Sequence, residues 1–151
     1  MAIREIVKLG DDVLRMRAKE VTDFNDNLGI LIDDMFDTMF RADGVGLAAP
    51  QIGIVRRICV ISVDGGKTKY ELVNPVVIKA SGVQHGAEGC LSCPGRSGVV
   101  ARPKKLTVQA QDRTGETKLY KVTGYEAVAF SHEMDHLDGI LFIDKIENED
   151  A

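Results

Sequence analysis

The residues best suited to chemistry in this 151-residue chain lie in one short stretch, residues 131–139. There His132 and His136 are four apart with Glu133 beside the first, and the chain has one further histidine, His85. On an α-helix, residues four apart lie roughly 40° apart around the axis, so both imidazoles leave the same face. Two neutral imidazoles so placed can bind one divalent metal ion, and Glu133 can handle the proton of a water that the ion activates. The competing interpretation is a surface helix that carries this spacing by chance.

A third metal ligand has to come from another part of the chain. A catalytic site of this type usually takes three protein ligands and leaves one position for water. In one large class of metallopeptidases a third histidine lies six residues after the second, but that position holds Phe142. The carboxylates that remain downstream, Glu147 and Glu149, lie on a tail too short to form a second helix that returns to the site. The third ligand is therefore expected upstream, within residues 84–95, where the candidates are His85, Cys90 and Cys93.

Cys90 and Cys93 also form a Cys-x-x-Cys pair, and this leaves several interpretations open. A metal ion would lower the pKa of either cysteine and hold it as thiolate. A thioredoxin-like redox pair lacks the strand-to-helix setting that such pairs have. A closed structural zinc site would use both cysteines and both motif histidines, but it would leave Glu133 without a role. His85 is more simply an exposed or capping side chain, and Cys59, in an apolar strand pattern, a small buried residue.

Three helices are expected to frame this chemistry. Residues 11–19 begin with acidic and end with basic side chains, which indicates a short helix. The third helix carries both motif histidines; Thr123 and Glu126 form a capping box at its start, and residues 138–139 end it. Residues 27–42 carry an apolar stripe at helical spacing that predicts a core-facing helix, namely Leu28, Leu31, Ile32, Met35 and Met39.

Between the helices, alternating and β-branched stretches predict strands. Turn-rich connections at residues 64–67 and 112–115 indicate two hairpins, and the Asn-Pro pair at residues 74–75 is expected to break one strand. The result is an α+β fold, in which antiparallel strands pack around a central metal-binding C-terminal helix, with N-terminal helices beside them. Residues 1–151 are expected to form a single domain. The predicted strands are residues 58–63, 69–73, 76–80, 105–111 and 117–122.

Composition excludes several classes of function. The net charge of −4 and the pI near 5.4 argue against binding to DNA, which needs a basic face. The sequence has no apolar segment long enough to span a membrane, and Glu5 interrupts any signal-peptide pattern at its start. Three cysteines without regular spacing do not make a disulfide framework. A reducing cytoplasm is the expected location.

Three segments together resemble the peptide deformylase family: residues 44–51 (GVGLAAPQ), 88–92 (EGCLS) and 132–139 (HEMDHLDG). They occur in that family's order and approximate spacing, and the resemblance covers nearly the whole chain. It implies a metal-dependent amide hydrolase that removes the formyl group from the N-terminal formylmethionine of newly synthesised polypeptides and releases formate. The alternative enzyme class, a general metallopeptidase, rests on the His-Glu-x-x-His pattern alone.

The resemblance also implies how the metal is held. It implies ligation by Cys90, His132 and His136 and a catalytic role for Glu133, and it thereby selects Cys90 over Cys93. The implied cofactor is one divalent ion, in this family usually Fe²⁺, with Zn²⁺, Ni²⁺ or Co²⁺ as alternatives. A set of one thiolate and two imidazoles does not choose among these ions.

For the substrate, the resemblance implies that the Gln51 amide and the Leu91 N–H face its carbonyl oxygen and stabilise the developing oxyanion. Residues near the metal motifs in sequence, or on the same helix, are assigned to binding the peptide and its methionine side chain: Val45, Gly46, Glu88, Tyr125, Val128 and Ala129. For Val128 and Ala129, packing in the core is an equally simple explanation.

The sequence departs from the family's pattern at two places. Cys93 stands where the family commonly has a bulky apolar residue, and it is either a small buried substitute or an extra thiol open to oxidation. The sequence ends at Ala151, whereas many members carry a further C-terminal helix to which ribosome docking has been attributed. The expected partners are N-formylmethionyl nascent peptides, without DNA or membrane, and transient ribosome contact is put in doubt.

Overall fold

The computed structural model describes residues 2–149. A five-stranded antiparallel sheet has the strand order β1-β2-β3-β6-β7, and a three-stranded antiparallel sheet has the order β4-β5-β8. The elements follow in the order η1 (3₁₀, Asp12–Arg15), α1 (Asp26–Arg41), β1 (Gly46–Ala48), η2 (3₁₀, Ala49–Ile52), β2 (Ile58–Ile61), β3 (Tyr70–Ser81), β4 (Gln84–Glu88), β5 (Gly98–Arg102), β6 (Lys105–Gln111), β7 (Thr117–Thr123), α2 (Gly124–His136), η3 (3₁₀, Phe142–Asp144) and β8 (Ile146–Glu149).

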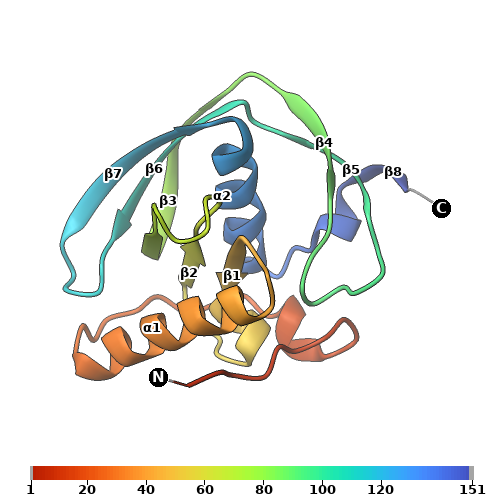
Figure 1. The fold of residues 1–151 in the computed structure, drawn as a ribbon. Coiled ribbons are helices and arrows are strands. Elements are labelled where there is room, and N and C mark those ends of the chain that lie inside the picture. The colour runs from red at the N-terminus through yellow and green to blue at the C-terminus, as the bar shows by residue number, and fades with distance from the viewer. Residues whose placement is uncertain (1, 150–151) are drawn as a thin grey trace.

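Helix α2 lies in the middle of the molecule, with the five-stranded sheet on one side and the three-stranded sheet on the other (Figure 1). Its inner face packs against the larger sheet through Ala127, Phe130 and Leu137, which are all fully buried. The α+β class and the central position of the C-terminal helix, both predicted from sequence, are confirmed. Among residues 2–149, no helix has the length and apolar character needed to cross a membrane.

Helix α1 forms as its periodicity predicts. The Asn25 side chain accepts a hydrogen bond from the Leu28 N–H at 3.1 Å and so satisfies one unpaired donor at the helix start. The predicted apolar stripe is buried against β1 and β2, and each such side chain contributes about 1.5–3 kcal/mol relative to exposure. Met35 and Met39 are fully buried core residues.

Helix α2 starts at the predicted place, but the predicted capping box is wrong. Thr123 is the N-cap residue, yet its side chain makes no capping hydrogen bond. The Glu126 side chain instead bonds to Tyr70, which stands in an aromatic cluster with Phe130. The helix ends near the predicted position, where Gly139 adopts a φ of 74° that favours glycine.

The two predicted hairpins form, but residues 74–75 do not break the strand. β2 pairs with β3 and β6 pairs with β7, both antiparallel. β3 runs through Asn74 and Pro75 by way of an irregularity in its register with β6 between Val73 and Val76. Asn74 adopts a φ of 52°, and its side chain bonds the N–H and C=O of Val21 at 2.8 and 2.9 Å. This bulge accommodates the proline inside the strand.

The helix predicted over residues 11–19 is also wrong, because only one 3₁₀ turn, η1, forms there. The Asp11 side chain caps that turn by accepting from the Val13 N–H at 3.1 Å. Further on, the backbone N–H groups of Ala18 and Lys19 donate to Leu137 and Val55. These tertiary hydrogen bonds hold residues 18–19 extended and prevent a longer helix.

Sequence reasoning missed the strands around the glycine-rich segments. No strand was predicted over residues 84–88, yet they form β4, which pairs with β5 along its whole length. β1 and β8 were also not predicted. The turn from β4 to β5 carries both Cys90 and Cys93, so these strands fix the loop that faces α2.

Candidate metal centre and substrate cavity

Cys90 comes within reach of both motif histidines. Its Sγ lies 3.3 Å from Nε2 of His136. Cys90, His132 and His136 each offer one ligand atom, and these three atoms lie within 4.8 Å of one another. Ligand atoms around a four-coordinate ion are expected about 3.3–3.8 Å apart, given bond lengths of about 2.0–2.3 Å. The group therefore fits a single metal ion, held by two side chains from α2 and one from the β4–β5 turn.

Burial and hydrogen bonds prepare both imidazoles for ligation. His132 Nδ1 lies 2.9 Å from Glu88 Oε1. Burial lowers the pKa of His132, but the carboxylates of Glu133 and Glu88 outweigh it and raise this pKa. In the neutral ring, an Nδ1–H that donates to Glu88 leaves Nε2 free to bind the ion. Burial lowers the pKa of His136 well below its usual value, so this ring is neutral at pH 7. A neutral imidazole is the form that binds a metal ion.

Glu88 is held in turn by a buried arginine. Arg102, on β5, donates to both Glu88 carboxylate oxygens at 2.9 Å and to Asp135 of α2 at 2.6 Å. Burial alone would raise the pKa of Glu88, but the hydrogen bonds from Arg102 and His132 outweigh it and hold this pKa at about 2. Glu88 is thus ionised, and its oxygens are taken up by two protein side chains.

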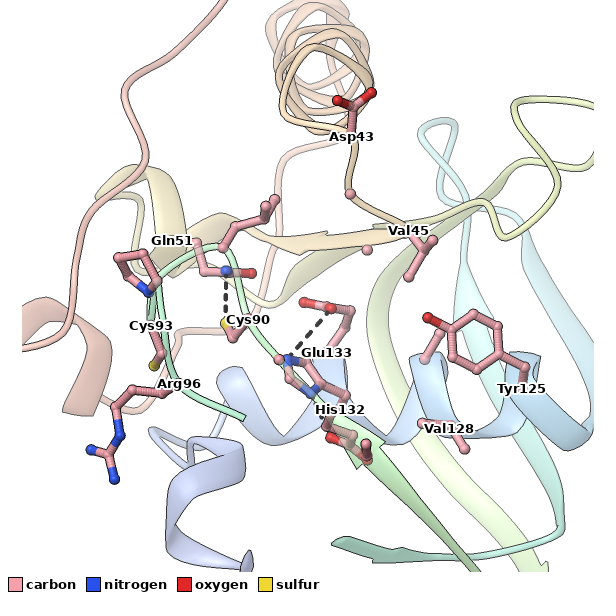
Figure 2. A pocket seen from close by; sticks show the side chains of 18 of the residues that line it. Asp43, Val45, Gln51, Cys90, Cys93, Arg96, Tyr125, Val128, His132 and Glu133 are labelled. Atoms are coloured by element: carbon pink, nitrogen blue, oxygen red, sulfur yellow. Dashed lines mark hydrogen bonds and ion pairs between the residues drawn. The ribbon is translucent and has the colours of Figure 1, made fainter. Parts of the chain in front are cut away.

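Glu133 is buried beside the metal group and has an unused carboxylate oxygen. Within residues 2–149 its Oε1 has no hydrogen-bond partner, while Oε2 lies 3.9 Å from His132 Nε2. Burial raises the pKa of Glu133 to about 7. Figure 2 shows its carboxylate directed toward the side of the cavity where Cys90 and Gln51 lie. This is the position and acidity that proton transfer at neutral pH requires.

Gln51 lies on the opposite wall and has a fixed orientation. Its Oε1 accepts from the Ala48 N–H at 2.9 Å, so its NH₂ group must face the loop. This group donates to Ser92 Oγ at 3.2 Å. It also donates to Cys90 Sγ at 3.5 Å (Figure 2). The Gln51 side chain is 1% exposed, and its N–H donors border the metal group.

A cavity of about 410 Å³ opens onto these residues. His136 lies behind its wall and is 1% exposed. Ala129 lines the cavity and also belongs to the core. The other residues that sequence reasoning assigned to the site also line the cavity: Val45, Gly46, Gln51, Glu88, Cys90, Leu91, Tyr125, Val128, His132 and Glu133.

Arg102 and Asp135 were missed by sequence reasoning. β5 alternates so that residues 98, 100 and 102 face inward, which places a charged side chain in the core. An arginine at the inward position of a strand needs a buried acidic partner, and this was the available signal. Asp43 and Arg96, at the cavity's rim, carried no comparable signal.

Cys93 lies next to the metal group but is not one of its three members. It is 1% exposed and packs with Leu14, Val100 and Phe142. Hydrogen bonding between the two thiols lowers the pKa of Cys93 to about 7 and raises that of Cys90. The predicted burial of Cys59 is confirmed, and His85 is an exposed residue paired with Glu147 at 2.7 Å.

Comparison with known proteins gives one consistent result. The chain matches the family model described as polypeptide deformylase over residues 3–151. It is 61% identical over 149 residues to a peptide deformylase of Heliobacterium modesticaldum, covering 99% of this chain and 97% of that one. The crystal structure of peptide deformylase from Thermotoga maritima superposes with a TM-score of 0.94 at 41% identity, covering 97% and 99% of the two chains. The chain therefore belongs to the polypeptide deformylase family.

Proposed function

We propose that Cys90, His132 and His136 hold the metal ion with which this chain removes the formyl group from N-formylmethionyl nascent peptides. The assignment of this reaction rests on the chain's membership of the polypeptide deformylase family. One observation carries the assignment of ligands, namely that three suitable ligand atoms converge beside the buried Glu133 at the wall of the cavity. An ion bound there supplies Lewis-acid activation of a water molecule, whose pKa falls toward about 7.

Ferrous iron is the ion we propose, with zinc, nickel or cobalt as alternatives. One thiolate and two imidazoles accept any of these ions. Cys90 contributes the soft ligand, and the two histidines contribute the borderline ones. The sulfur and nitrogen donors favour a transition metal over a hard cation, because hard cations prefer oxygen ligands.

Glu133 is proposed to move the proton. Its carboxylate is buried and has an unused oxygen, and its pKa of about 7 lets it both accept and release a proton at neutral pH. It would take a proton from the attacking water and deliver it to the leaving amine of methionine. General acid–base catalysis of this kind contributes about 10²–10⁴-fold to a rate.

The Gln51 amide and the N–H of Leu91 are proposed to stabilise the oxyanion that forms on the formyl oxygen. The Ala48 N–H holds the Gln51 carbonyl, so the Gln51 NH₂ group faces the metal group, and the oxyanion would replace Cys90 Sγ, at 3.5 Å, as acceptor for one of its two N–H donors. Each well-placed donor is worth about 3–4 kcal/mol in such a role. Both residues line the cavity.

The peptide itself is proposed to lie along β1. This strand is at the edge of the five-stranded sheet and borders the cavity through Gly46, so an extended peptide can add to it. Val45, Tyr125, Val128 and Ala129 are proposed to contact the methionine side chain. For Glu88 we now propose a positioning role, because Arg102 and His132 already occupy its oxygens.

The same proposal treats residues 1–151 as one catalytic domain that works in the cytoplasm. The family model spans residues 3–151 without interruption, which supports one unit. Deformylation of new polypeptides takes place where they are made, so transient contact with ribosomes is part of the proposal. Binding to DNA is not, since the chain carries a net charge of −4.

The direct test is formate release from formyl-Met-Ala by iron- or nickel-loaded protein. Formate is expected, and its absence from folded, metal-replete protein would overturn the proposal. An N-acetylated, unformylated peptide is the control substrate, because its cleavage would indicate a general metallopeptidase. Metal content of two variants tests the ligands: Cys90→Ser should lose the ion, whereas Cys93→Ser should keep it. A structural zinc site would lose its ion and unfold in both.

A further inference from the structure

Cys90 and Cys93 stand at the two ends of one tight turn. The Cys93 N–H donates to the Cys90 carbonyl at 3.0 Å, the hydrogen bond of a four-residue turn. The Cα atoms at the ends of such a turn lie within about 7 Å of each other. A disulfide needs a Cα–Cα separation of about 4.4–6.8 Å, so the backbone of this turn is compatible with a bond between the two sulfurs.

Both sulfurs belong to the same pocket of the structure. Cys90 and Cys93 each line the cavity that leads to the metal group, and Figure 2 places them on the same loop. Cys90 packs against the apolar cluster that contains Cys93. Cys59, the third cysteine, lies in β2 within a different core cluster. A small reagent entering the cavity can therefore reach Cys90, which is partly exposed, while the buried Cys93 is the second thiol of the same turn.

We propose that Cys90 and Cys93 form a peroxide-sensitive site, in which oxidation to an intramolecular disulfide removes the metal's thiolate ligand and releases the ion. The proposal rests on the proposed ligation by Cys90. The metal group is made of three side chains, so loss of Cys90 leaves two imidazoles. Two imidazoles alone do not form a complete zinc or iron site.

The chemistry is balanced with hydrogen peroxide as the oxidant. The Cys90 thiolate attacks one peroxide oxygen, the O–O bond breaks, and sulfenic acid and hydroxide form. The Cys93 sulfur then attacks the Cys90 sulfur, the S–O bond breaks, and the disulfide and hydroxide form, while the thiol proton converts that hydroxide to water. Two electrons pass from the two sulfurs to the peroxide.

A second thiol changes the outcome of oxidation. A sulfenic acid without a nearby thiol proceeds to sulfinic and sulfonic acids, which thiol reductants do not reverse. Cys93 competes with that step and converts the damage into a disulfide, which they do reverse. The turn therefore protects the metal ligand from permanent loss.

Zinc-loaded protein tests the proposal, because zinc itself has no redox chemistry. After one equivalent of hydrogen peroxide, wild type should release its zinc in parallel with formation of a Cys90–Cys93 disulfide, seen by peptide mass spectrometry. Dithiothreitol and fresh zinc should then restore full zinc content. A second treatment uses excess hydrogen peroxide, about three equivalents or more, because each step from thiolate to sulfenic, sulfinic and sulfonic acid consumes one. Under that treatment wild type should still recover its zinc, whereas Cys93→Ser should start with bound zinc, accumulate sulfinic and sulfonic acid at Cys90, and recover no zinc. Cys59→Ser is the matched control and should behave as wild type.

The proposal is overturned if wild type loses zinc while Cys93 still reacts with iodoacetamide after denaturation. It is equally overturned if Cys93→Ser recovers as fully as wild type. Cys93→Ala serves if the serine variant does not fold. Failure of the ligand assignment has a different signature, namely that untreated Cys90→Ser binds zinc as tightly as wild type. None of these measurements requires deformylase activity.

Discussion

Gly46 on β1 lies against the side chain of Glu133. A β-carbon at position 46 would fall 2.8 Å from both Cγ and Cδ of Glu133 and would overlap the carboxylate Oε2 as well. Real β-carbons do not approach other atoms this closely, so any side chain at position 46 must displace Glu133. Because Gly46 has no side chain, the carboxylate of Glu133, which is proposed to move the proton, can occupy its position against β1.

Gly46→Ala should lower kcat/KM for formyl-Met-Ala by about 10²-fold, because a displacement of about 1 Å at a reacting group has an effect of that size. The metal content should be unchanged, since no ligand moves directly. Gly86→Ala is the matched control: Gly86 lies on β4, and a β-carbon there meets nothing within 4 Å. Wild-type activity in Gly46→Ala would show that Glu133 tolerates displacement.

Glu133→Gln should retain the metal ion and lose activity by about 10²–10⁴-fold. The amide preserves the shape of the side chain but does not accept and release a proton. Metal analysis together with the formate assay separates this result from loss of the ion. Undiminished formate release by the variant would refute the role proposed for Glu133. The same variant also tests the metallopeptidase alternative if an unformylated peptide is included.

Asp112, far from the site, gives a prediction about pH and stability. Hydrogen bonds led by the Thr114 hydroxyl lower the pKa of Asp112 from 3.8 to about 2. A folded-state pKa below the unfolded one stabilises the protein above pH 3.8, and this stability is lost as the pH falls toward 2. Asp112→Asn should therefore be less stable than wild type at pH 6, and the difference should shrink between pH 4 and 2. Urea unfolding of metal-free protein measures it, with Asp23→Asn as the control.

Sequence reasoning succeeded where the pattern is local and regular. β6 spans the predicted residues 105–111, because Leu106, Val108 and Ala110 alternate with polar residues and face one core. α1 differs from its predicted bounds by one residue at each end, since a single apolar stripe and the Asn25 cap specify it. The pairing of Cys90 with the histidines came from the family resemblance, because spacing alone left Cys93 open.

The failures concern partners that are distant in sequence. Nothing near Pro75 reveals that Asn74 will bond Val21, which is what lets the strand continue past the proline. Nothing near residues 18–19 reveals that their N–H groups donate to Leu137 and Val55 and prevent a helix. Tertiary hydrogen bonds override local propensity at both places.

Arg102 was missed for the same reason, because its partners Glu88 and Asp135 are distant from it in sequence. Arg102 holds Glu88, Glu88 holds His132, and His132 is proposed to hold the metal ion. Removing the charge in Glu88→Gln should weaken metal binding by about 10–100-fold, the usual effect of losing the carboxylate that orients a ligating histidine. It also leaves the buried Arg102 with Asp135 as its remaining counter-charge, so folding stability should fall by less than the roughly 3–5 kcal/mol of a fully unpaired buried charge.

The chain contains its own control for this prediction. His85 and Glu147 form another imidazole–carboxylate pair, at 2.7 Å compared with 2.9 Å for His132 and Glu88, but both side chains are about half exposed. Glu147→Gln should change stability by about 0–1 kcal/mol and leave metal affinity unaltered, because solvent screens exposed pairs. Metal titration by competition with a chelator, and urea unfolding, measure both variants. Equal metal affinity in Glu88→Gln and Glu147→Gln would mean that the Arg102–Glu88 pair stabilises the fold without positioning His132.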